Sequence, residues 1–229
     1  EDGAVVAYLT NGPERVRATK VQLNGNRLSI QAPGYQNRID AEFRDARFEG
    51  TVQLLRPRGV IKSVRFVGMP GQAWRFFPKP GVAPADFSGR WALTFRDDDG
   101  GERAAIAELH QDGHEIWGTI LRASGDDRYI AGEVRGDTLF LSRFDGGSAY
   151  LYLGRLGMDG TLSGDFHTGG GYHETWSGRR NAEARLEDPA QLTELKPGMD
   201  RLEFAFPDLD GNLRKFPDVQ HAGKVVLIT

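Results

Sequence analysis

The sequence predicts an all-β, antiparallel fold, and three features of its 229 residues support this. First, glycine is frequent, with 30 residues. Second, many of these glycines follow Asn or Asp in dipeptides that supply the positive φ angles of tight hairpin turns. Third, the short runs between the turns show a period of two, as at residues 139–142 and 150–155. The dipeptides are Asn11-Gly12, Asn24-Gly25, Asp112-Gly113, Asp145-Gly146, Asp159-Gly160 and Asp210-Gly211.

A first β-meander unit is predicted for residues 1–80. About seven runs of strand-forming residues fall in it, and one further strand before them would make eight. Residues 48–52 resemble residues 116–120, which favours two related units in tandem. Because the chain starts at Glu1 without a methionine or a basic leader, we expect its N-terminus to be trimmed. The runs are 4–10, 15–23, 27–32, 38–45, 48–56, 60–67 and 72–77.

An eight-stranded antiparallel, barrel-like unit is predicted for residues 86–181. It follows a linker at residues 77–84, whose prolines remove the backbone donors that a central strand needs. Antiparallel strands joined by short turns fit a closed up-and-down barrel, which leaves no exposed sheet edge. The predicted strands are 89–96, 102–110, 115–122, 127–134, 137–144, 148–156, 161–167 and 173–180.

The C-terminal residues are predicted to leave the barrel and begin another domain. Residues 182–200 form a linker with a short helix, since Asp188-Pro189 is a good helix start and Pro197-Gly198 ends it. Residues 225–228 are a continuous apolar run, which fits a strand buried on both faces of a parallel sheet. Such a strand needs neighbours and a crossover helix. We therefore expect residues 201–229 to be the first strands of a second domain, and the chain to be a fragment cut just after the strand at 225–228.

The C-terminal motifs carry a family resemblance. Phe204-Ala-Phe-Pro-Asp-Leu-Asp-Gly211 is followed by Asp218 and then by Gly223-Lys-Val-Val-Leu-Ile-Thr229. This order resembles the start of the thioredoxin-like domain in TlpA-like thiol-disulfide oxidoreductases, of the alkyl hydroperoxide reductase/thiol-specific antioxidant group. The barrel region is similar to the β-rich domain that precedes it in a subset of that family. The matching stretches there are Phe87-Ser-Gly-Arg-Trp91, Gly118-Thr119, Leu141-Ser-Arg-Phe-Asp-Gly146, Leu162-Ser-Gly164, Arg179-Arg-Asn181 and Ala184-Arg-Leu-Glu-Asp188.

The resemblance implies an exported protein, periplasmic or anchored to the bacterial cell envelope. In that family a Trp-Cys-x-x-Cys motif follows the first strand, but this chain has no cysteine. The resemblance therefore implies that redox chemistry, with a redox partner protein, belongs to a missing domain. It also implies that this chain is inactive. No catalytic residue and no cofactor is predicted here, and the role left to the chain is positioning or partner selection.

A second hypothesis is a binding barrel. Phe87-Ser-Gly-Arg-Trp91 resembles the Gly-x-Trp that opens lipocalin-like barrels, and inward aromatic side chains would line a pocket for a small apolar ligand. A hollow interior would favour this hypothesis, and a packed one would count against it. A structural or adhesion module is a third reading. The candidate ligand-binding residues are Trp91, Trp117, Tyr129, Phe144, Tyr150 and Trp176.

Metal sites are considered and not predicted. If two loops met, His110, His114, His167 and His173 would suit zinc, with Glu174 as a further ligand. Solvated turn histidines are the preferred interpretation, and Asp97-Asp-Asp99 is read as a polar hairpin tip rather than a calcium site. Arg143 and Asp145, two apart on one strand face, are read as a surface ion pair.

Composition excludes several classes of protein. The net charge is −3, from 29 basic and 32 acidic residues, so nucleic acid is not an expected partner. No apolar stretch reaches the roughly 20 residues of a membrane helix. Without cysteine there is no disulfide and no thiolate zinc site. Nucleophile elbows, phosphate loops and dinucleotide fingerprints are also missing from the sequence.

Overall fold

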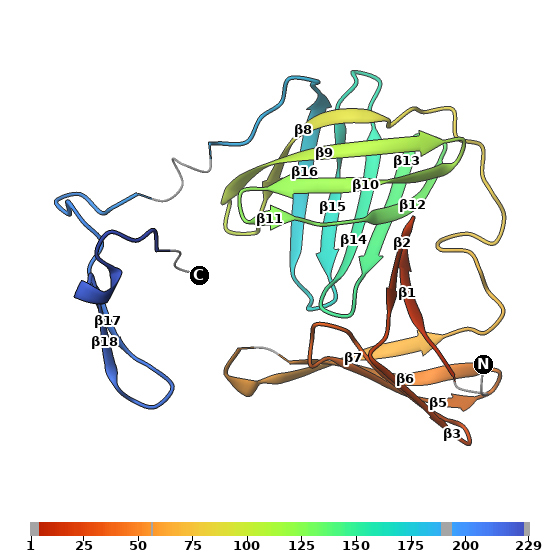
Figure 1. The fold of residues 1–229 in the computed structure, drawn as a ribbon. Helices are drawn as coiled ribbons and strands as arrows, with labels where there is room; N and C mark the ends of the chain where they lie inside the picture. Colours follow the sequence, from red (N-terminus) through yellow and green to blue (C-terminus); the bar gives the residue numbers. More distant parts are fainter. Residues whose placement is uncertain (1–4, 56, 189–193, 227–229) are drawn as a thin grey trace. The chain divides into compact units, whose positions relative to one another are not determined.

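The computed structural model describes residues 5–55, 57–188 and 194–226. The chain divides into two compact units, Glu1–Leu186 and Glu187–Thr229. The first unit contains an N-terminal hairpin and sheet followed by a barrel, and the second contains a single short hairpin in its described part (Figure 1).

In the described part of the first unit, eight consecutive antiparallel strands form a closed ring (Figure 1). Each strand pairs with the next, and β8 pairs with both β9 and β16, which closes the sheet. A two-residue strand, β11 (Gly125–Asp126), pairs with the end of β10. The predicted antiparallel barrel is therefore confirmed. Its strands are β8 (Gly89–Arg96), β9 (Glu102–Asp112), β10 (Glu115–Arg122), β12 (Ile130–Arg135), β13 (Thr138–Phe144), β14 (Ala149–Leu156), β15 (Leu162–Thr168) and β16 (His173–Arg180).

The barrel core follows from the period-two patterning of these strands. On β13, Leu139, Leu141 and Arg143 are buried while their neighbours are half-exposed, because successive side chains point to opposite faces. Most of the inward side chains are apolar and pack against one another inside the ring. The largest of these are Phe87, Trp91, Phe95, Tyr152, Phe166 and Trp176.

The N-terminal part forms a hairpin and an open sheet. Strands β1 (Tyr8–Asn11) and β2 (Glu14–Arg17) pair with each other, and five described strands form an antiparallel meander from β3 to β7. The predicted run at 15–23 is split at Ala18-Thr19, where the chain passes from the hairpin into the sheet. The predicted run at 72–77 is not a strand. The meander consists of β3 (Lys20–Asn24), β4 (Arg27–Gln31), β5 (Arg38–Arg44), β6 (Arg47–Leu55) and β7 (Ile61–Gly68), with the short 3-10 turn η1 (Pro57–Gly59) before β7.

The C-terminal unit overturns the thioredoxin-like prediction. Its described part holds the hairpin β17 (Phe204–Pro207) and β18 (Leu213–Phe216), then the 3-10 turn η2 (Val219–His221). Val225 and Val226 lie in no strand, and Val225 is fully exposed. Residues 227–229, and residues 189–193 of the predicted helix, lie outside the described part. No α-helix and no parallel strand pair occurs among the described residues, so the TlpA-like assignment is wrong.

The motif that suggested this family has a local explanation. The Asp208 carboxylate accepts hydrogen bonds from the backbone N–H groups of Asp210 and Asn212, at 3.0 and 2.8 Å. Asp-x-Asp-Gly is therefore turn chemistry, which any β-hairpin can use. The resemblance alone implied a thiol-disulfide oxidoreductase with a redox or antioxidant role, so these predictions are wrong as well. The envelope location and the redox partner followed from that resemblance alone and stay untested. Among the described residues, no helix has the length and apolar character to cross a membrane.

Candidate functional site

The barrel interior is filled by side chains. Trp91 and Trp176 are buried, and Phe95 lies 6.2 Å from Trp176 and 6.0 Å from Phe166, measured between ring centroids. The cavity left between Leu93, Tyr152 and their neighbours measures about 10 Å³. Such a volume holds no more than about one water molecule. A packed interior counts against a ligand inside the barrel, whereas the antiparallel barrel that this hypothesis requires is present.

A cluster of buried polar side chains lies at one end of the barrel interior, where β10 ends and β16 begins. The Arg122 guanidinium lies 3.9 Å from the Phe95 ring centroid and donates to the Tyr152 hydroxyl at 3.1 Å. Tyr152 in turn donates to the Asp127 carboxylate. Glu174 is fully buried and pairs with Arg103, and its second oxygen lies 3.9 Å from Arg122. Burial raises the pKa of Asp127, and the Tyr152 hydroxyl and Arg122 oppose that effect.

Arg143 and Asp145 form an ion pair, but it is not on the surface as predicted. Both side chains are buried, at 7% and 2% exposure. Asp145 also accepts from the backbone N–H groups of Gly147 and Ser148, at 2.8 and 2.9 Å. Arg143 also donates to the Asp127 carbonyl at 2.7 Å. The pair is buried because Arg143 occupies an inward position of β13, opposite Tyr150.

Four of the six predicted ligand-binding residues lie in the barrel core, against it, or toward the N-terminal part. Trp91 and Trp176 belong to the core, and Tyr150 packs against it, 5.3 Å from Phe166. Phe144 points outward from β13, toward Leu9 and Ile30 of the N-terminal part. The structure brings the remaining two, Trp117 and Tyr129, together on the outside of the barrel.

Trp117 lies at the centre of a cleft on the outer wall. It faces outward from β10, opposite His110 of β9, and the two rings are 6.1 Å apart with planes inclined by 22°. The turn of the β1–β2 hairpin rests on this wall. A Cβ at Gly12 would lie 3.3 Å from the Ala131 Cβ and 3.5 Å from the Trp117 Cβ, and Gly12 has a φ of +56°. A glycine here allows both the turn and its close approach to the barrel.

The hairpin turn divides the outer cleft into two pockets, both bordered by Pro13 and Trp117. One has a volume of about 700 Å³ and lies against residues 73–80. The other has a volume of about 460 Å³ and lies against Tyr129. Their walls combine aromatic faces with charged edges. The larger pocket includes Trp74, Arg75, Phe77, His114 and Glu133, and the smaller includes Glu108, His110, Thr119, Arg128 and Tyr129.

Hydrogen bonds fix the wall of the larger pocket. Glu133 accepts from the backbone N–H groups of Phe76 and Phe77, at 3.1 and 3.3 Å. Arg75 donates to the Thr10 carbonyl at 2.6 Å and to the Ser142 hydroxyl at 2.9 Å. The segment after β7 is thus tied to both β1 and the barrel, so the pocket is formed before any ligand arrives.

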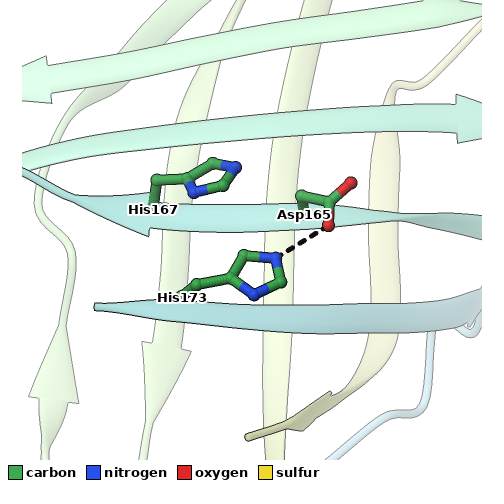
Figure 2. A group of neighbouring side chains, drawn as sticks. All are labelled: Asp165, His167 and His173. Carbon is green, nitrogen blue, oxygen red and sulfur yellow. Dashed lines mark hydrogen bonds and ion pairs between the residues drawn. The ribbon is translucent and has the colours of Figure 1, made fainter. Parts of the chain in front are cut away.

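A second group of side chains lies on the outer face of β15 and β16 (Figure 2). Asp165 and His167 are two residues apart on β15, and His173 of β16 is directly opposite His167. The Nε2 atom of His173 lies 2.8 Å from Asp165 Oδ1, and its Nδ1 atom lies 3.7 Å from Asp98 Oδ1. The hydrogen bond to Asp165 and the charges of both carboxylates raise the pKa of His173.

The four histidines considered for a metal site do not meet at one place. His167 and His173 do meet, but His110 and His114 border the cleft around Trp117 instead. Glu174 points into the barrel and takes no part. The carboxylate near the imidazoles is Asp165, which sequence reasoning missed. The signal was available, since Asp-x-His on a strand places both side chains on one face. Asp97 accepts from Gly101 N and from Arg103, as in a polar hairpin tip.

The chain matches no family model and no curated protein. A solved structure with some similarity is the crystal structure of a protein of unknown function from the DUF3598 family of Nostoc punctiforme. It is 11% identical, covers 77% of this chain and 87% of that chain, and has a TM-score of 0.32. A likeness of this size assigns neither family nor function.

Proposed function

We propose that this protein is a small-molecule-binding β-barrel whose ligand lies in the outer cleft around Trp117. The observation that carries the proposal is the pair of pockets that share Trp117, with volumes of about 700 and 460 Å³. Ligand pockets in proteins measure roughly 300–1,000 Å³. The packed barrel then serves as the rigid support of the site and not as its container.

The lining indicates the kind of ligand. Trp117, Trp74 and Tyr129 offer aromatic faces, on which a ring can stack with its centroid about 4.5–7 Å away. Charged groups of both signs, such as Arg75 and Glu133, lie at the edges. Among the described residues, the buried Thr119 hydroxyl beside Trp117 has no hydrogen-bond partner. A small ligand with an apolar ring face and a polar rim satisfies these groups together.

A fluorescence titration with 8-anilinonaphthalene-1-sulfonate tests the proposal, since this probe joins apolar rings to a charged group. Wild-type protein should bind it saturably, and Trp117→Ala should weaken binding by about tenfold. Phe206→Ala removes another exposed aromatic side chain, in the separate C-terminal unit, and serves as the matched control. Circular dichroism establishes that each variant is folded. Equal affinity of Trp117→Ala and wild type, or no saturable binding, would overturn the proposal.

A further inference from the structure

We propose that Asp165, His167 and His173 form a binding site for a divalent first-row transition-metal ion, with zinc as its representative. The site lies on the outer face of the β15–β16 hairpin (Figure 2). It is independent of the cleft around Trp117, and no residue is shared between the two.

The ligand atoms are nearly in place. One ligand atom from each of the three residues can be chosen so that all lie within 4.8 Å of one another. In a tetrahedral zinc complex with bonds of about 2.0–2.1 Å, ligand atoms lie about 3.4 Å apart. The His173 Nε2 and Asp165 Oδ1 atoms, at 2.8 Å, are already closer than that. The His167 ring needs to approach by up to about 1.4 Å, which a side-chain rotation provides because all three residues are half-exposed.

The backbone holds these side chains in register. His167 pairs with His173 across the two strands, and the ring centroids are 4.8 Å apart. Backbone hydrogen bonds hold the connecting turn, with Thr168 N donating to the Tyr172 carbonyl at 2.9 Å and Gly171 N donating to the Thr168 carbonyl at 3.0 Å. The Thr168 hydroxyl accepts from Gly170 N and Tyr172 N, at 3.3 Å each. A site on paired strands is therefore pre-organised, as metal affinity requires.

Asp98 supplies an outer carboxylate. It lies on the Nδ1 side of His173, 3.7 Å away, while Nε2 faces Asp165. Ligating histidines in proteins commonly donate their second ring N–H to a carboxylate, which orients the ring and makes it a stronger ligand. A small movement of the exposed Asp98 side chain, to hydrogen-bond distance, would complete a carboxylate–histidine–metal series at His173.

The donor set selects among ions. Two imidazoles and one carboxylate suit zinc, cobalt, nickel and copper, whereas magnesium and calcium prefer oxygen ligands alone. Three protein ligands leave at least one coordination position open to water or to an exogenous ligand.

Isothermal titration calorimetry of untagged protein with zinc chloride tests the proposal. Wild type should bind one ion per chain, and His167→Ala, His173→Ala and Asp165→Asn should each weaken binding by about tenfold or more. The double variant His110→Ala/His114→Ala removes two other histidines and should bind as wild type does. Magnesium chloride should give no binding heat. Absence of zinc binding by wild type, or unchanged binding in His167→Ala and His173→Ala, would overturn the proposal.

A measurement on wild-type protein guards against variants that fold poorly. In imidazole ¹H–¹⁵N spectra, zinc should shift the ring signals of His167 and His173 while those of His110, His114 and His221 stay in place. Shifts spread over all the histidines would identify non-specific binding and contradict the site.

Discussion

The side chain of Asn11, at the end of β1, makes two hydrogen bonds with the main chain of Phe144, at the end of β13. Its Nδ2 donates to the Phe144 carbonyl and its Oδ1 accepts from the Phe144 N–H, both at 3.0 Å. Asn11 is 1% exposed. Asn37 acts similarly nearby, donating to the Gly146 carbonyl at 2.7 Å and accepting from Leu55 N–H at 2.7 Å. These two amides join the N-terminal part to the barrel hairpin that connects β13 and β14.

Replacing Asn11 by Ala should therefore destabilise the first unit. Two backbone groups of Phe144 lose their partner in a partly buried place, at about 1–3 kcal/mol for each unsatisfied group. For the two groups together, we expect the free energy of unfolding in urea to fall by about 2–6 kcal/mol. Asn24→Ala, on the exposed end of β3, should change it by less than about 0.5 kcal/mol. A similar small change in both variants would show that the Asn11 amide does not carry the contact.

Asp145 should make stability depend on acid pH. Burial alone would raise the pKa of this carboxyl, but the N–H groups of Ser148 and Gly147 and the Arg143 guanidinium outweigh burial and lower it below its ordinary value. The stabilisation is present above the unfolded-state pKa of about 3.9 and is lost as the pH falls through the lower folded-state pKa. Asp145→Asn should be less stable than wild type at pH 6, with the difference shrinking below about pH 4. A difference that does not vary with pH would contradict this assignment.

Asp127 is also buried, but its effect on stability should depend on pH in the opposite direction to that of Asp145. Burial raises its pKa, and the Tyr152 hydroxyl and Arg122 compensate only in part. An acid with a raised folded-state pKa loses stability as the pH rises through that value. The stability of Asp127→Asn relative to wild type should therefore increase between about pH 4 and pH 7. Urea unfolding of the two proteins across this range provides the measurement, and a relative stability that decreases with pH would sink the prediction.

The strands were predictable because their signals are local. The predicted strands 89–96, 115–122 and 173–180 coincide with β8, β10 and β16, since a period of two and a turn dipeptide are both visible in the sequence. The start of β12 was placed three residues early. Arg128 adopts a positive φ of 53°, and the chain before it forms β11 and turns Asp127 inward. Arginine has no preference for a positive φ, so the sequence does not predict this turn.

The sites were harder to predict because they depend on residues far apart in the chain. Trp117 and Tyr129 were candidates, but a period of two does not tell the inside of a barrel from the outside. Their cleft exists because the turn at Gly12 packs on the barrel wall at Trp117, about a hundred residues further along the chain. The thioredoxin-like prediction is wrong for the opposite reason, because the motif around Asp208 is a local turn signature and does not require a whole domain.

Three glycines reveal how closely the barrel strands approach one another. A Cβ at Gly118, Gly132 or Gly164 would lie 2.0, 1.7 or 1.8 Å from a carbonyl oxygen of the neighbouring strand. Backbone atoms cannot move aside as a side chain can, so substitution forces the strands apart.

Gly132→Ala should therefore lower stability by about 3 kcal/mol, the upper end of the range for overpacked cores. Gly136→Ala is the matched control, because Gly136 has a φ of +65° and open space at its Cβ position. That variant bears only the cost of a left-handed backbone, about 1–2 kcal/mol. Thermal unfolding of both variants should place Gly132→Ala at the lower melting temperature. The reverse order would mean that the barrel strands separate easily, and close strand approach would then not be what requires glycine at position 132.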